Sequence, residues 1–312
     1  MDVFIKARDN DLDFFYNNPI YLDVQDEQGQ SLLHYAIRGN ASDVVFYLLD
    51  NNINPNIASN RGETPIFEAI RKGKIDIVIS LIKHFALINV KNSIGETPLH
   101  LACQKGSIQL INLLIENGAD IFSLNSRGES IVFYALRSHN VDTYDYVRML
   151  SPEIKRKDYK ENTLLHLASM LGSTVMVEHL FKLKENPHLK NDLKETPIFE
   201  VVKKGYTQLL SIFVQYGSYT DLKNKYGETL KDIATRNDLE EVIDFLIRHE
   251  ESSLFIKNIE KNPLRHAVVK TDYDKVRYLK YSGIDDIKDE FLLYAYDYAR
   301  KDQNRDILLL LD

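Results

Sequence analysis

Residues 95–103 read GETPLHLAC, and residues 62–70, which lie 33 residues earlier, read GETPIFEAI. Related stretches return at the same spacing along the chain, without insertion or deletion. The eight stretches begin at Gly29, Gly62, Gly95, Gly128, Glu161, Lys194, Gly227 and Glu260. A fixed period of this length indicates stacked repeats, each of which buries its apolar face against its neighbours.

Every stretch carries the signals of a helix start. Thr64 and Thr97 stand at the N-cap position, and Pro65 and Pro98 follow at the first helical position, where the missing N–H costs nothing. The other stretches place Ser31, Ser130, Thr163, Thr196, Thr229 and Asn262 at the cap. Small residues one turn further in predict close helix stacking. They are Ala36, Ala69, Ala102, Ala135, Ala168, Ala234 and Ala267, with Val201 as the exception.

The end of this first helix needs a residue that tolerates a left-handed backbone. Suitable residues stand there in seven repeats: Gly73, Gly106, Gly172, Gly205, Asn40, His139 and Asp238. Thr271 breaks the pattern in the last repeat. A second helix is predicted next, because apolar residues recur three apart on one face. Its main column is Leu48, Leu81, Leu114, Val147, Leu180, Phe213, Leu246 and Leu279.

The period, together with the Thr-Pro-Leu-His-x-Ala signature of residues 97–102, resembles the ankyrin repeat, a β-turn followed by two helices. The resemblance covers about residues 25–285. It implies an all-α ankyrin-repeat solenoid that forms a single domain over residues 1–312. Eight full repeats are expected over residues 26–285, with an N-terminal capping unit at 1–25 and C-terminal capping helices at 286–312, because the ends of a stack meet water.

Composition narrows the class of protein. The 312 residues are 44% apolar and 27% charged, with a formal net charge of −7 that disfavours general nucleic-acid binding. The single cysteine, Cys103, precludes an intrachain disulfide and fits a reducing compartment. No signal-peptide core and no apolar run of membrane-spanning length stand out. A cytoplasmic location is therefore expected, and secretion as an effector stays open.

The sequence offers no reactive constellation. All thirteen glycines fall in or beside turn and helix-end positions, so none is left for a phosphate-binding loop. His34, His100 and His166 occupy the third helical position, where a side chain can reach back to the cap. Cys103 stands in a mostly apolar column and is expected to be buried. We therefore expect a non-enzymatic protein with no cofactor and no metal site.

The ankyrin resemblance implies that a partner would contact the turn tips and the exposed end of the first helix, which line a concave face. Cations occupy that helix end in seven of the eight repeats. The candidate contacts are Arg38, Arg71, Lys72, Lys105, Arg137, Lys203, Lys204 and Arg236. We call them the basic row. Cations also stabilise helix C-termini, and Glu68 and Glu200 are spaced to pair with Arg71 and Lys203, so a purely structural role stays open.

Two further features accompany the basic row. A glutamate follows the turn in five repeats, at Glu63, Glu96, Glu129, Glu195 and Glu228, and predicts an acidic edge. Met170 and Leu171 interrupt the basic row in the fifth repeat, with Tyr134 and Tyr159 expected nearby. Exposed apolar residues in a charged groove resemble an anchor pocket. Alternatively, they repack a local irregularity.

These features favour a scaffold that binds a partner protein or peptide in the concave groove. One alternative is a nucleic-acid or other polyanion binder along the basic row, which the glutamates disfavour by repulsion. Another is a recruiting subunit or effector whose chemistry resides in a partner. The protein is expected to be a monomer with no membrane partner.

Overall fold

A computed structural model of the chain describes residues 2–18, 21–216, 218, 220 and 222–249. The chain divides into two compact segments, residues 1–230 and residues 231–312. The predicted last repeat, with Thr271, and the predicted C-terminal capping helices lie outside the described residues.

Helix pairs make up the first segment. The N-terminal pair is α1 (Val3–Arg8) and α2 (Leu12–Asn17). The first helices of repeats 1–6 are α3 (Leu32–Arg38), α5 (Pro65–Lys72), α7 (Pro98–Lys105), α9 (Ile131–Arg137), α11 (Leu164–Met170) and α13 (Pro197–Lys203). The second helices are α4 (Ser42–Asp50), α6 (Ile75–Lys83), α8 (Ile108–Glu116), α10 (Val141–Met149), α12 (Thr174–Lys182) and α14 (Thr207–Gln215). Further along, α15 spans Leu230–Arg236.

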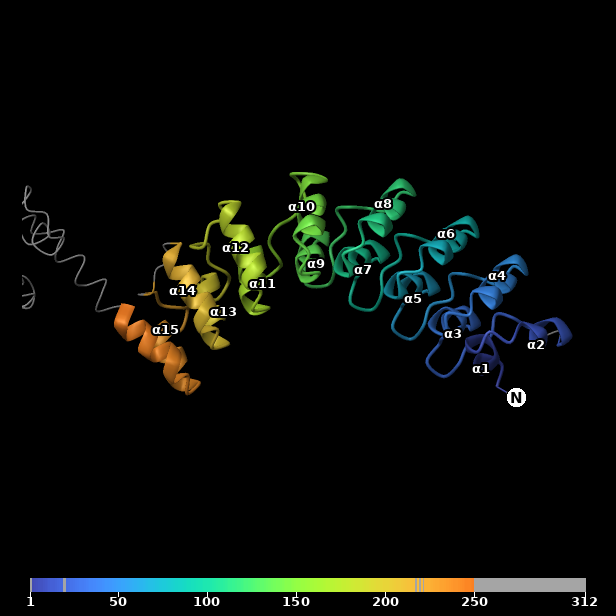
Figure 1. Cartoon of the computed structure of the whole chain (residues 1–312), viewed down its shortest axis with the longest axis horizontal. Coiled ribbons are helices and arrows are strands. Elements are labelled where there is room, and N and C mark those ends of the chain that lie inside the picture. Colours follow the sequence, from blue (N-terminus) through green and yellow to red (C-terminus); the bar gives the residue numbers. More distant parts are fainter. Residues whose placement is uncertain (1, 19–20, 217, 219, 221, 250–312) are drawn as a thin grey trace, which may run out of the picture. The chain divides into compact units, whose positions relative to one another are not determined.

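Each first helix packs on the first helices of the neighbouring repeats, and each second helix packs mainly on the first helix of its own repeat. The first helices contact one another in order from α1 to α13, and Figure 1 shows the pairs side by side. The described residues contain no strand, only isolated antiparallel bridges such as Gln25–Ser31 and Lys157–Thr163, which flank turns. The predicted all-α solenoid of ankyrin type is confirmed.

The core follows the predicted columns. Ala36, Ala69 and Ala102 are 0% exposed, which lets successive first helices approach closely. Leu48, Leu81 and Leu114 of the second helices are equally buried. The N-terminal unit buries Phe15 of α2 against the same layer and so covers the first repeat.

The first helices end in the predicted left-handed conformation. Gly73 and Gly106 have φ of 71° and 76°, and Asn40 and His139 adopt 58° and 56° without a glycine. The turns show the same tolerance. Glu161 and Lys194 have φ of 61° and 58° where repeats 1 to 4 have a glycine, so repeats 5 and 6 each carry a mildly strained turn.

An Asx residue organises each of six turns. The Asn125 side-chain oxygen accepts from the N–H groups of Arg127 and Glu129 at 2.8 and 3.0 Å. The equivalent residues are Asp26, Asn92, Asp158, Asn191 and Asn224. Backbone bonds also join successive turns: the N–H of Ser126 donates to Ile94 at 3.0 Å, and the N–H of Tyr159 donates to Arg127 at 2.8 Å. The turns are therefore held in a fixed register.

The three signature histidines connect neighbouring repeats. His100 Nδ1 accepts from the backbone N–H of Thr97 at 3.2 Å, which confirms the predicted capping role. Its other nitrogen, Nε2, lies 3.4 Å from the carbonyl oxygen of Glu129 in the next repeat. His34 and His166 make the same contacts to Glu63 and Glu195. Each histidine therefore fixes the turn of the following repeat.

Candidate functional site, a cavity between repeats 4 and 5

Alternate repeats carry an ion pair between the turn and the first helix. Arg137 Nη2 donates to Glu129, and Lys203 Nζ lies 2.5 Å from Glu195. Arg71 donates to Glu63 at 2.9 Å and to Glu68 at 2.7 Å. Glu129 and Glu195 are only 5% and 2% exposed. The basic row and the acidic edge therefore neutralise each other in these repeats and are not two separate binding features.

The pKa values reflect this pairing. Burial alone would raise the pKa of Glu129, but the hydrogen bond and charge of Arg137 hold that pKa below its usual value. Burial would likewise lower the pKa of Arg71 and of Lys203, yet their glutamate partners raise both. The sequence spacing also predicted ion pairs between Glu68 and Arg71 and between Glu200 and Lys203. Both are confirmed, at 2.7 and 2.9 Å.

The remaining cations of the basic row differ in their surroundings. Arg38 donates to Gln30 at 3.0 Å and lies 3.8 Å from Glu68. Lys105 is exposed and donates to the carbonyl oxygen of Arg71 at 3.1 Å, at the C-terminal end of α5. Lys72 and Lys204 are exposed on the first segment, and Arg236 is exposed in α15.

Tyr134 does not lie where the sequence interpretation placed it. It is 3% exposed, and its hydroxyl donates to Glu96 at 2.5 Å and accepts from Asn125 at 2.9 Å. Its ring lies under the guanidinium of Arg137, 4.9 Å from centroid to Cζ. Tyr134 was predicted as an exposed partner contact, but this network leaves its ring almost entirely buried.

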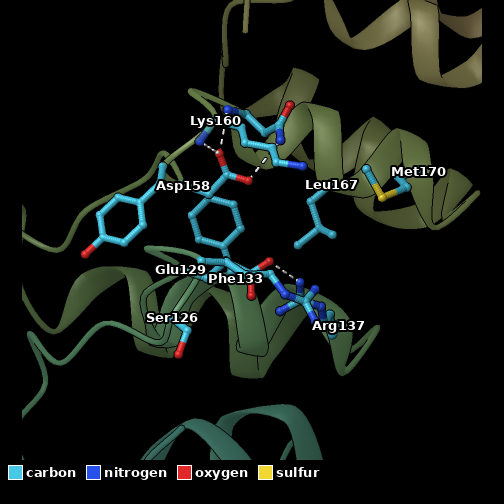
Figure 2. Close-up of a pocket in the computed structure, with 11 residues that line it drawn as sticks. Ser126, Glu129, Phe133, Arg137, Asp158, Lys160, Leu167 and Met170 are labelled. Carbon is cyan, nitrogen blue, oxygen red and sulfur yellow. Dashed lines mark hydrogen bonds and ion pairs between the residues drawn. The ribbon is translucent and has the colours of Figure 1, made fainter. Parts of the chain in front are cut away.

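A cavity of about 580 Å³ lies where the basic row is interrupted. Phe133, Leu167 and Met170 give it an apolar wall, and Tyr159 stands at its turn edge. The other lining residues are polar or charged: Ser126, Arg127, Glu129, Arg137, Asp158, Lys160 and Asn162. Figure 2 shows Phe133 between the Asp158 turn and the Glu129–Arg137 pair, with Leu167 and Met170 to one side on α11.

Both carboxylates of the cavity are buried and accept hydrogen bonds from internal donors. Glu129 accepts from Arg137 and from the Asn125 amide at 2.7 Å. Asp158 accepts from the N–H groups of Lys160 and Asn162, each at 2.8 Å. Both acids are therefore engaged within the protein and scarcely exposed to a ligand.

Two local features distinguish the surroundings of this cavity. Within the described residues, α9 packs more sparsely on α11 than it does on α7. Tyr159 is 60% exposed, and its ring lies directly over Gly128, where an added Cβ would come within 2.5 Å of the ring. Met170 is 41% exposed at the end of α11. Leu171 caps that helix, is only partly exposed and does not line the cavity.

Of the predicted contacts, Met170, Tyr159 and Arg137 line the cavity together, whereas Tyr134 and Leu171 do not line it. Sequence reasoning missed Arg127, Lys160 and Leu167. A signal for Leu167 exists, because it stands one helical turn before Met170, so that repeat 5 has two apolar residues on one helix face. Arg127 and Lys160 share one turn column with Arg61.

Other features of the described residues contrast with this cavity. A hollow of about 360 Å³ at repeats 1 and 2 is lined only by polar and charged side chains, among them Arg38, Arg61 and Arg71.

No three His, Cys, Asp or Glu side chains in the described ranges are grouped to hold a metal. Cys103 is 0% exposed, and burial raises the pKa of its thiol. Within the described residues, no helix has both the length and the apolarity needed to span a membrane.

Comparison with known families identifies the class. A model described as ankyrin repeats (3 copies) matches residues 4–92, 85–162 and 165–258, which together exceed half of the chain. The chain belongs to the ankyrin-repeat family. Ankyrin repeats are generally protein–protein interaction modules.

A solved structure agrees on the fold. The crystal structure of the human ASB11 ankyrin repeat domain matches with a TM-score of 0.58 and 21% sequence identity. The match covers 70% of this chain and 98% of that domain. At this identity the likeness concerns the fold alone.

Proposed function

We propose that this protein binds a partner protein or peptide on the surface formed by its turns and the C-terminal ends of its first helices. We place the anchor of that interaction in the cavity between repeats 4 and 5. The observation that carries the proposal is the coincidence of the cavity with the interruption of the basic row at Met170. An apolar wall ringed by polar groups is typical of interaction hot spots.

The ion pairs support this reading over the polyanion alternative. Arg71, Arg137 and Lys203 are held by glutamates, so binding a phosphate would have to compete with a neighbouring carboxylate. A basic groove for nucleic acid requires cations that release counterions on binding. Reversing the exposed Lys72, Lys105 and Lys204 together should therefore leave partner binding intact if the anchor is the cavity.

The test is Met170→Arg, which places in repeat 5 the kind of residue that repeats 1, 2 and 4 already carry. The matched control is Gln104→Arg, which makes the same kind of change at the same helix position in repeat 3. Both variants should keep the wild-type helicity and melting temperature. Proteins captured from source cells by the full chain would be quantified for the wild type and both variants.

We expect the captured set to be shared by the wild type and Gln104→Arg and to be depleted about tenfold or more by Met170→Arg, as for an anchor residue. Unchanged capture by Met170→Arg would place the interaction elsewhere. If heparin or an oligonucleotide bound at about 50 mM salt and the lysine reversal abolished that binding, the polyanion alternative would replace the proposal.

A further inference from the structure

The cavity between repeats 4 and 5 has an imbalance of charge that bears on what it can hold. Its lining includes three cationic residues, Arg127, Arg137 and Lys160, and two acidic ones, Glu129 and Asp158. Both acids are buried and already accept internal hydrogen bonds. The charges that remain available to a ligand are therefore positive.

Arg127 and Lys160 are the cations that can meet a ligand. Both are exposed at successive turn tips, and in the described part of the chain neither side chain forms a salt bridge. A third cation stands close by, since Lys155 Nζ lies 4.7 Å from the centroid of the Tyr159 ring. Arg127 and Lys160 line the same cavity as the apolar residues Leu167 and Met170 of α11, which are labelled with Lys160 in Figure 2.

We propose that the cavity takes a segment of the partner in which a large apolar side chain lies within one or two residues of an aspartate or glutamate. This inference rests on the proposed function and specifies the partner's chemistry. The apolar side chain packs against Phe133, Leu167 and Met170. The neighbouring carboxylate lies at the turn edge and pairs with Arg127 or Lys160.

Geometry makes the two requirements compatible in one short segment. The apolar wall and the cationic turn tips border a single cavity of about 580 Å³, which lies within the range of peptide side-chain and small-ligand sites. A basic segment would meet like charges at the turn tips, and the two acids of the cavity are already engaged. The hollow at repeats 1 and 2 also has exposed cations but lacks the apolar wall, so it does not satisfy both requirements.

A displayed library of random short peptides, selected on the immobilised full chain, tests this inference. Met170→Arg removes the apolar contact, and Arg127→Glu with Lys160→Glu reverses the turn-tip charge. Arg61→Glu is the matched control, because Arg61 occupies the same turn position in an earlier repeat. Arg127→Gln with Lys160→Gln serves as a milder pair if the reversal disturbs the turns, which circular dichroism and melting would reveal.

We expect selected peptides to combine a large apolar residue with a nearby acid. Their affinity should fall about tenfold or more with Met170→Arg and with the turn-tip reversal, and remain unchanged with Arg61→Glu. Raising the salt concentration should also weaken binding, since exposed charge pairs are screened. Selection on the turn-tip reversal variant should instead enrich basic peptides.

Three results would overturn the inference: no enrichment, enrichment of apolar peptides without acids, or acidic peptides that bind both variants as well as the wild type. The proposed function is judged separately by cellular capture. A partner that depends on Met170 but is indifferent to the turn-tip reversal would leave the proposed function standing and remove the acidic requirement. A partner insensitive to both changes would remove the proposed function itself.

Discussion

The cap residues of alternate repeats have different surroundings, although they occupy equivalent positions. Thr97 Oγ1 lies 2.8 Å from His100 Nδ1, whereas Thr64 is followed by Phe67 at the histidine position. The Thr64 hydroxyl is buried and has no hydrogen-bond partner. The Thr196 hydroxyl in repeat 6 is also buried without a hydrogen-bond partner, and Phe199 stands there at the histidine position. A buried hydroxyl without a partner destabilises the fold.

Valine substitution at the two caps should therefore have opposite effects. Thr97→Val removes the contact to His100 and should lower the free energy of unfolding by about 1–2 kcal/mol. Thr64→Val replaces an unsatisfied hydroxyl by a methyl group and should be neutral or stabilising by up to ~1 kcal/mol. Urea unfolding of both variants would check this, and equal losses would show that the cap hydroxyl contributes equally in the two repeats.

Buried histidines also give the protein a pH dependence. Burial lowers the pKa of His100 to about 4 and lowers those of His34 and His166. The unfolded chain takes up protons near the ordinary histidine pKa of about 6.5, while the folded chain does not. The contribution of these neutral, buried histidines to the free energy of unfolding is therefore fully present above that pH, and it is lost as the pH falls toward the pKa of the folded state. His100→Phe, which copies the residue of the alternate repeats, should flatten the decline in unfolding free energy between about pH 6.5 and pH 5. An unchanged slope would exclude His100 as a contributor.

At the scale of elements, the turn of one repeat and its first helix are joined by buried ion pairs. Removing one partner of such a pair leaves an uncompensated buried charge, which costs more than the intact pair contributes. Arg137→Met should therefore lower the unfolding free energy by about 3 kcal/mol, because it leaves Glu129 unpaired. Glu129→Gln combined with Arg137→Met should recover much of that loss. Lys105→Met, at an exposed lysine without an acidic partner in the described residues, is the control and should change stability little.

Asparagines join the loops that follow the second helices. Asn89 donates to the carbonyl oxygen of Gly118 at 2.9 Å and accepts from the N–H of Asp120 at 2.9 Å. Asn56 makes the equivalent bonds to Phe85 and Leu87. Phe122 stands at the same position in the next repeat and is 50% exposed. Asn89→Ala should therefore lower the unfolding free energy by about 1–2 kcal/mol in urea titrations, and Phe122→Ala should lower it less. The reverse order would show that these bonds add little.

At the scale of the whole first segment, stability is a sum of repeats and of the interfaces between them. The sparser packing of α9 on α11 makes the boundary between repeats 4 and 5 the expected place for local opening. Matched amides report on it, since Ser126 and Tyr159 each donate an equivalent backbone bond to the preceding turn. In native-state hydrogen exchange, the N–H of Tyr159 should exchange faster than that of Ser126. Equal rates would indicate that the cavity does not weaken the interface.

The 33-residue spacing by itself determined the helices, their caps and the buried columns, because each depends on residues close together in sequence. The left-handed positions and the histidine capping contacts follow from the same local geometry. The site depended on the tertiary structure. Whether Arg137 faces solvent or Glu129, and whether Tyr134 is exposed, depends on side chains brought together across a turn or from another repeat. The cavity at Met170 likewise depends on how tightly repeats 4 and 5 pack against each other. That packing is a property of many side chains together and cannot be read from any single repeat position in the sequence.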